Sequence, residues 1–330
     1  MNNVSNESNS EVPVWKAMTA LKISGICAYI TVFTVAVVNN LIVLTVIVTQ
    51  KNMRNSTNLF IGNLAVADLT VAFLVQPFTL FHELLMEWPF GGFTCKLVAY
   101  LQGLAVSASV STLAAVAVER YFAVVLSKGG NQLQGFWAAF VLFLLWTIPA
   151  VLNIPWILFF DTKTIQGPKI TLTICRPQTN FYFRSYFIGV VLLAFYVLPL
   201  LFMCVCYALI GLKVWGRARG LKISSSAAAR NIHRSKIRIV RMLCTVTVVF
   251  AISWLPVHIV TLYVTINKPL TLDENRLIRE GVRPIVRFVS SVNTAVNPFI
   301  YCYFSKQFRR GFSKIIGRRF VCSDRGSNDI

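Results

Sequence analysis

Long apolar runs, each broken by only a few polar residues, recur along this chain and are separated by short polar segments. Each run reaches the length of about 20 residues that an α-helix needs to cross roughly 30 Å of hydrocarbon. Seven such runs occur, at residues 23–49, 57–84, 94–125, 135–158, 185–213, 238–265 and 283–303. The pattern predicts an all-α membrane protein in which a short segment, 1–22, precedes a seven-helix bundle at 23–303.

The composition agrees with a membrane protein and excludes an ordinary soluble domain. Of the 330 residues, 56% are hydrophobic and 13% are charged, and the mean hydropathy is +0.65. Average soluble domains contain about 25% charged residues. A net charge of +20 would suit nucleic acid, but the basic residues gather beside the apolar runs, where anionic lipid headgroups attract them. We therefore expect membrane lipid, and no nucleic acid, as a partner.

The distribution of Lys and Arg predicts the orientation of the bundle. If the N-terminus lies outside, the inner segments hold 20 of the 32 basic residues and only three of the 12 acids, Glu119, Asp324 and Asp329. Basic segments stay on the cytoplasmic side, so the N-terminus is expected outside. The sequons at Asn3 and Asn6 agree, because glycosylation requires an extracellular or lumenal segment.

Two cysteines fall on the outer side in this orientation. Cys95 begins the third run at its outer end, and Cys175 lies between the fourth and fifth runs. A disulfide between them would persist, because the outer side is oxidising. Cys322, beyond the last run, is a candidate for palmitoylation.

Polar residues at membrane depth need a partner or a function, because their desolvation is costly. Asp68 lies near the middle of the second run, Ser109 lies in the third, and Asn293 and Asn297 lie in the seventh. These oxygens suit a small hard cation such as sodium. The alternative is that Asp68 is protonated or hydrogen-bonded within the bundle.

Other residues lie where a helix ends or bends. Glu119 and Arg120 fall at the cytoplasmic end of the third run, where they neutralise each other or Arg120 binds a cytosolic partner. Phe250 and Trp254 precede Pro256, which removes a backbone donor and loosens the sixth run. Large rings beside a kink suit a moving part or ordinary packing.

The motifs together resemble the rhodopsin-like (class A) G-protein-coupled receptors over nearly the whole chain. They arrive in that family's order: Asn40, LAVAD ending at Asp68, WPFGGFTC ending at Cys95, ERY at 119–121, Trp146, Pro199 with Tyr207, FAISWLP at 250–256 and NPFIY at 297–301. The third and seventh runs are most similar to receptors for neuropeptide FF, RFamide peptides and neuropeptide Y. The resemblance implies a plasma-membrane receptor that passes ligand binding to a heterotrimeric G protein, with arrestin and receptor kinases as further partners.

The resemblance also implies roles for particular residues. Asp68, Ser109, Asn293 and Asn297 match a sodium pocket of the inactive state, so sodium is expected as a modulator and no other cofactor. The residues that match the activation switch are Phe250, Trp254, Pro256, Glu119, Arg120, Tyr207, Asn297, Pro298 and Tyr301. Lys236 replaces an acid at the base of the sixth run, so Glu119 is expected to be the only partner of Arg120. Residues 304–317 match an amphipathic eighth helix with Phe304 and Phe308 facing lipid, followed by a tail at 318–330.

A peptide is the ligand that the resemblance favours. Gln102 stands where aminergic receptors carry Asp, and Ser291 stands where opsins carry the retinal lysine. Thr265 replaces the acid with which relatives bind a ligand arginine, although Glu83 and Glu87 remain available to a basic ligand such as an RFamide peptide. His258 is expected to touch the ligand or to serve in packing.

The seventh run adds three arginines that point to a different peptide. Arg279, Arg283 and Arg287 are spaced by four residues, which predicts one helical face. If that face points inward, the pocket prefers a peptide with an acid, sulfate or carboxyl terminus. If it points outward, the arginines are interfacial.

The sequence offers no catalytic constellation. Its three histidines, His82, His233 and His258, are scattered, and no paired carboxylates or metal-ligand spacing accompany them. We therefore expect a receptor and no enzyme. A transporter or channel is the alternative, although the chain lacks the internal repeat of many transporters.

Overall fold

A computed structural model gives the structure of this chain and describes residues 14–53, 55–126, 136–166, 171–224, 227–267, 271, 274 and 277–316. The predicted modification sites Asn3, Asn6 and Cys322 lie outside these residues. The side chain of Lys236 is likewise outside the described part.

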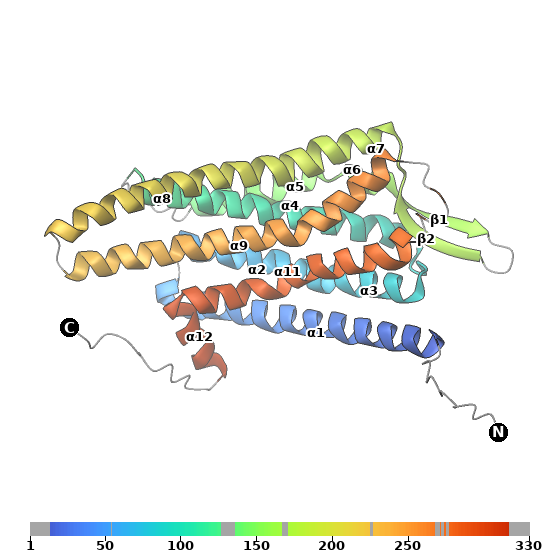
Figure 1. Cartoon of the computed structure of the whole chain (residues 1–330), viewed down its shortest axis with the longest axis horizontal. Helices are drawn as coiled ribbons and strands as arrows, with labels where there is room; N and C mark the ends of the chain where they lie inside the picture. The colour runs from blue at the N-terminus through green and yellow to red at the C-terminus, as the bar shows by residue number, and fades with distance from the viewer. Residues whose placement is uncertain are drawn as a thin grey trace, which may run out of the picture.

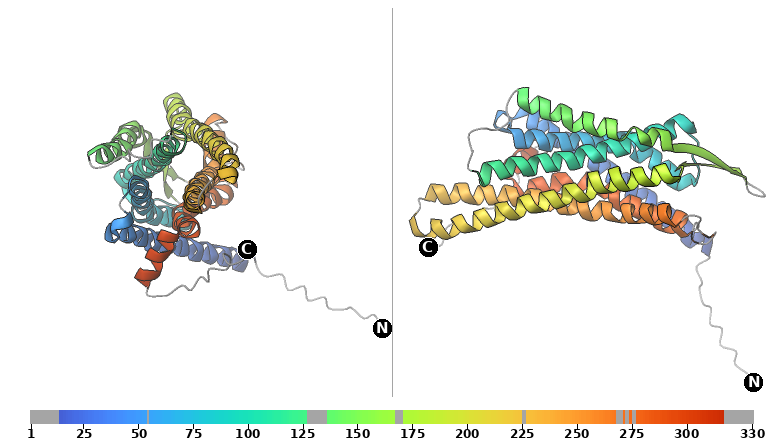
Figure 2. Two further views of the ribbon diagram at one scale, coloured as in Figure 1. Left: turned by 90° about the vertical axis from the view of Figure 1, so that its left-hand side faces the viewer. Right: turned by 90° about the horizontal axis from the view of Figure 1, so that it is seen from above.

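Long helices run side by side along the molecule and form a bundle (Figure 1). In chain order they are α1 (Val14–Thr49), α2 (Ser56–Leu74), α3 (Gln76–Leu85), α4 (Gly91–Val124), α5 (Phe136–Leu152), α6 (Pro155–Phe159), α7 (Phe181–Tyr186), η2 (Phe187–Val197), α8 (Leu198–Ser224), α9 (Ala227–Ile266), η3 (Ile278–Val282) and α11 (Arg283–Phe304). A turn, η1 (Lys51–Met53), joins α1 to α2, and α12 (Lys306–Ile316) follows α11. Seen from the end that carries α12, the helices form a ring (Figure 2).

Several predicted spans consist of more than one helical piece, for local reasons. The second span breaks between α2 and α3 at Val75, directly before the Gln76–Pro77 pair, since proline cannot donate to the preceding turn. The fourth breaks before Pro155, where α6 begins. The fifth contains the π-helix η2, whose hydrogen bonds join residues five apart, whereas those of an α-helix join residues four apart.

Six of the helical segments that the structure describes are long and apolar enough to cross a membrane. The remaining long helix, α11, falls below that level because it carries a row of polar residues. These polar side chains are buried: Ser290, Ser291, Asn293, Thr294 and Asn297. Because they face the bundle and not lipid, α11 completes a seventh span, and the all-α membrane fold predicted from sequence is confirmed.

Buried amides tie the helices together. Asn40 of α1 donates from Nδ2 to the carbonyl oxygen of Thr294 on α11 at 2.8 Å. Asn63 of α2 donates to the hydroxyl of Thr112 on α4 at 2.8 Å and accepts a hydrogen bond from the indole of Trp146 on α5 at 2.8 Å. Such bonds fix the rotation of each helix, because an unpaired amide in this interior is costly.

A β-hairpin that was not predicted from the sequence lies at the outer end of the bundle. Strands β1 (Phe160–Gln166) and β2 (Thr171–Pro177) pair antiparallel, with Thr162 opposite Cys175. A disulfide joins Cys175 to Cys95 at the start of α4, as predicted. The backbone N–H of Trp88 also donates to the carbonyl of Thr173 at 2.7 Å. The hairpin is therefore attached to the bundle by a disulfide and a hydrogen bond, and Lys96 of α4 also pairs with Asp161 of β1 at 3.5 Å.

The predicted lipid-facing position of Phe308 is wrong. Phe308 is 1% exposed, and its ring lies 5.6 Å from that of Tyr301 at the end of α11. Phe304 also packs against the main core. The cause is the close approach of α12 to α1, which Gly311 permits, since a Cβ there would lie 2.6 Å from a methyl of Val46.

Candidate functional site

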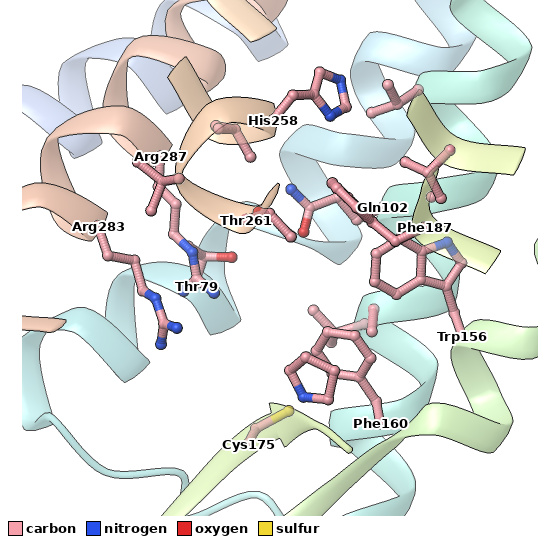
Figure 3. Close-up of a pocket in the computed structure, with 18 of the residues that line it drawn as sticks. Thr79, Gln102, Trp156, Phe160, Cys175, Phe187, His258, Thr261, Arg283 and Arg287 are labelled. Carbon is pink, nitrogen blue, oxygen red and sulfur yellow. The ribbon is translucent and has the colours of Figure 1, made fainter. Parts of the chain in front are cut away.

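An outer cavity of about 200 Å³ lies beneath the hairpin, between α3, α4, η2, α9 and α11. The side chains labelled in Figure 3 surround it from these separate elements. The volume is smaller than the roughly 300–1,000 Å³ of pockets that enclose drug-sized ligands. The cavity therefore has room for the end of a larger ligand.

The structure brings most of the predicted ligand-binding residues to this cavity. The predicted residues that line it are Gln102, His258, Thr265, Arg283 and Arg287. Their contact with a ligand stays a prediction. Glu83 does not line the cavity, and its carboxylate accepts a hydrogen bond from Arg287 at 2.6 Å. This carboxylate is thus already paired with an arginine of the same chain.

One wall of the cavity is aromatic, and sequence reasoning missed it. Trp156 and Phe160 have ring centroids 5.1 Å apart, and Phe187 lies nearby on η2. The indole of Trp156 donates to Oδ1 of the buried Asn153 at 2.9 Å, and Nδ2 of Asn153 donates to the hydroxyl of Ser107 at 3.1 Å. These residues follow the helix break before Pro155. This proline was the sequence signal that could have predicted a change of direction there.

Gly103 on α4 makes this aromatic wall possible, and its replacement gives a first prediction. A Cβ at position 103 would lie 2.6 Å from both Oδ1 of Asn153 and Nε1 of Trp156. These two atoms form a hydrogen bond with each other, so moving either one away from the added Cβ would break that bond. We expect Gly103→Ala to destabilise the purified protein by about 1–3 kcal/mol, the usual cost of overpacking. Gly211→Ala is the control, because a Cβ there meets nothing within 4 Å. Equal thermal stability of the two variants would contradict the prediction.

The opposite side of the cavity is cationic. Arg287 pairs with Glu83, whose side chain is 8% exposed. Arg283 forms no hydrogen bond or ion pair among the residues that the structure describes. Arg279, the outermost of the three aligned arginines, does not line the cavity. It lies within the π-helix η3 and pairs with Glu280 at 3.2 Å, with its side chain 38% exposed.

The floor of the cavity is formed by rings of α9. Phe250, Trp254 and His258 succeed one another along this helix, and all three line the cavity. The imidazole of His258 lies 4.4 Å from the ring of Tyr196, whose hydroxyl donates to the carbonyl of Ala251 at 2.7 Å. A ligand at this depth would touch the helix that contains Pro256.

The residues predicted to hold sodium, called the polar cluster here, are buried on three helices, α2, α4 and α11. Asp68 accepts a hydrogen bond from Nδ2 of Asn297 at 2.9 Å, next to Pro298. Ser109 and Asn293 are also buried. The side-chain oxygens of Asn293 and Asn297 have no hydrogen-bond partner among the described residues. The cluster therefore offers a carboxylate together with two unused amide oxygens.

An ion pair lies near the inner end of α4. Arg120 lies 3.0 Å from Glu119, and their side chains are 14% and 8% exposed. Thr57 of α2 also accepts a hydrogen bond from Arg120, and the hydroxyls of Ser56 and Thr57 donate to Glu119. The expectation that Glu119 is the only partner of Arg120 is therefore wrong, because α2 supplies a second partner.

Two tyrosines of the predicted switch lie within the same inner half. Tyr301 of α11 is 1% exposed and belongs to the main core, against which Tyr207 of α8 packs. The predicted switch residues thus extend from the cavity floor to the inner ion pair. Their role in activation stays a prediction.

Comparison with known proteins identifies the family. Residues 39–301 match the family model of the 7 transmembrane receptor (rhodopsin family). The chain is 33% identical to neuropeptide Y receptor type 2 of Cavia porcellus over 308 residues, which cover 89% of this chain and 76% of the relative. It is 34% identical to the same receptor of Mus musculus, over 87% of this chain and 74% of the relative. It is 31% identical to tachykinin-like peptides receptor 99D of Drosophila melanogaster, over 85% of this chain and 54% of the relative.

These matches favour a receptor over the transporter or channel alternative and make the chain a multi-pass protein of the plasma membrane, not an enzyme. The chain therefore belongs to the rhodopsin family of seven-transmembrane receptors.

Proposed function

We propose that this receptor binds the end of a peptide in its outer cavity and transmits binding to a heterotrimeric G protein. The observation that carries the proposal is the depth of the cavity, which extends from the hairpin at Cys175 to Phe250 and Trp254. The relatives support a peptide, since their names describe receptors for neuropeptide Y and for tachykinin-like peptides. A cavity of about 200 Å³ suits a peptide terminus better than a whole peptide.

Two peptide classes compete for this site. An RFamide or neuropeptide FF-like ligand follows from the sequence resemblance, but its arginine needs an acid. Thr265 supplies none, and Glu83 is already bonded to Arg287. Glu87 remains as an acid for such a ligand, although it does not line the cavity. An acidic peptide is the second candidate, and the unpaired guanidinium of Arg283 favours it.

The mechanism that we propose is a population shift between two arrangements of the bundle. A ligand changes the equilibrium only through its higher affinity for the active arrangement. Contacts with Gln102 and the rings of Trp254 and His258 would give that preference, because these residues line the cavity on α4 and α9. Release of Arg120 from Glu119 and Thr57 would then expose a guanidinium to the G protein. Arrestin and receptor kinases are further partners on the same inner side.

We also propose a sodium ion as a modulator, and the polar cluster fits one. The oxygen atoms that would hold the ion, as hard cations prefer, are those of Asp68, Ser109, Asn293 and Asn297. The unpartnered Oδ1 of Asn293 supports this assignment. A bound cation would neutralise the buried carboxylate of Asp68 and so stabilise the arrangement that encloses it.

Replacing Asp68 tests the sodium site without any agonist. Sodium at about ten times its dissociation constant should stabilise the wild-type receptor by about 1.4 kcal/mol relative to choline. Asp68→Asn should lose this stabilisation, because the amide carries no negative charge. Thermal unfolding of purified receptor in sodium or choline chloride measures the difference. Asp161→Asn, which changes an exposed acid of the hairpin, is the control. A sodium effect of the same size in Asp68→Asn excludes the site.

The proposed function is tested by nucleotide exchange. The receptor in membranes with G protein is screened against amidated, free-acid and sulfated peptides, and Arg120→Ala serves as the uncoupled control. We expect at least one peptide to accelerate exchange with the wild type and not with Arg120→Ala. The absence of any active peptide, together with ion flux in proteoliposomes, would overturn the proposal in favour of a channel.

A further inference from the structure

Arg283 is the one arginine at the cavity that lacks a counter-charge among the described residues. It is the first residue of α11, it lines the cavity, and Figure 3 shows its guanidinium directed into the space beside Arg287. Arg287 differs because its guanidinium is bonded to Glu83 at 2.6 Å. The charge of Arg287 is therefore neutralised within the receptor, whereas the charge of Arg283 is not.

The surrounding charges leave this guanidinium uncompensated. The charged groups that act on Arg283 are three cations, Arg176, Arg279 and Arg287, and one acid, Glu83. Glu83 is already used by Arg287. No Asp, Glu or Lys is among the residues that line the described cavity. An unpaired charge in a partly buried site costs free energy, and a ligand anion would offset that cost.

The chemistry of the two walls narrows the ligand further. Guanidinium is suited to planar or tetrahedral oxyanions, which it binds through two parallel hydrogen bonds. Across the cavity stand Trp156, Phe160 and Phe187, which present aromatic surface. The cavity is thus complementary to a group that is anionic at one side and apolar at the other.

We infer that Arg283 forms an anion-binding subsite of the outer cavity, and that the ligand places a carboxylate or sulfate against it while an apolar side chain lies against Trp156. The inference rests on the proposed function, because it takes the ligand to be a peptide. The anion is a free C-terminal carboxylate or a sulfated tyrosine, which share this chemistry.

Three capped amino acids test the subsite in the full-length receptor, purified into lipid nanodiscs. N-acetylphenylalanine carries the carboxylate, N-acetyl-O-sulfotyrosinamide carries the sulfate, and N-acetylphenylalaninamide is neutral. Binding is measured by the thermal stabilisation that each produces. We expect at least one anionic probe to bind the wild type about tenfold more tightly than the neutral probe, as removal of one charge partner predicts. The stronger anionic probe identifies the source.

Substitutions assign that preference to Arg283. Arg283→Gln should abolish it, Arg283→Lys should keep part of it because the charge remains, and Arg279→Gln should leave it unchanged because that arginine pairs with Glu280. Equal binding of the three probes, no binding of any, or a full preference in Arg283→Gln would overturn the inference. The Lys variant decides the matter if the Gln variant does not fold, since a reduced preference supports the subsite and an unchanged one opposes it.

The nucleotide-exchange screen separates this inference from the proposed function. Active peptides that show no preference for an anion would overturn the subsite alone. Anionic probes that bind through Arg283, without any active peptide, would leave the subsite in place and overturn the peptide agonist.

Discussion

Replacing Cys175 with Ser is expected to remove most correctly folded receptor from the cell surface. The disulfide to Cys95 closes a loop of 80 residues, and loop-closure entropy alone gives such a bond about 4.5 kcal/mol. Its loss also frees β2, which covers the cavity, so ligand affinity should fall with stability. Surface labelling and thermal unfolding of the purified receptor measure both effects.

The free cysteines provide a matched control for this experiment. Cys204 is exposed on α8 and forms no disulfide in the structure that is described. Cys204→Ser should therefore leave surface expression near the wild-type level. Comparable surface expression and unfolding temperature for Cys175→Ser and Cys204→Ser would contradict a structural role for the bond.

The membrane fold could be predicted from sequence because its signals are local. Apolar runs, prolines and basic segments follow directly from the demands of the bilayer, so the seven spans emerged from the pattern alone. The seventh shows the limit of composition. Its polar residues, such as Asn293 and Asn297, lower its hydropathy, and only their burial against other helices explains how α11 belongs in the membrane.

The features that were missed depend on contacts between distant segments. Glu83 and Arg287 are 204 residues apart, so no local pattern links them. The position of Phe308 depends on how closely α12 approaches α1, which the glycine at 311 permits. An amphipathic pattern shows that one face is apolar, but it does not distinguish lipid from a neighbouring helix.

The row of arginines at the outer end of α11 shows how much a periodic pattern can predict. Arg279 is four residues from Arg283, which in an α-helix would place both on one face. In the structure Arg279 lies within the π-helix η3, pairs with Glu280 and does not line the cavity, whereas Arg283 and Arg287 do. The spacing therefore indicated a shared face, but it could not show where along that face the cavity ends.

Breaking the ion pair between Glu83 and Arg287 is expected to cause the second large loss of stability. Arg287→Gln leaves the carboxylate of Glu83, which is 8% exposed, without its partner, so we expect a loss of about 3 kcal/mol. Glu83→Gln should cost less, about 1–2 kcal/mol, because the Arg287 side chain is 30% exposed and can be hydrated. The double variant should lose less stability than the two single variants lose together. The difference, the coupling energy, should be about 1–3 kcal/mol.

A double-mutant cycle on thermal unfolding measures this coupling, and an exposed pair serves as the control. Lys96 and Asp161 lie 3.5 Å apart with side chains 36% and 45% exposed, so their coupling should be at most about 1 kcal/mol. Coupling of the Glu83–Arg287 pair no larger than that of the control would show that water, and not the bundle, surrounds the pair. In that case Glu83 would be free to bind a basic ligand group, and the result would favour an RFamide peptide over an acidic peptide as the ligand.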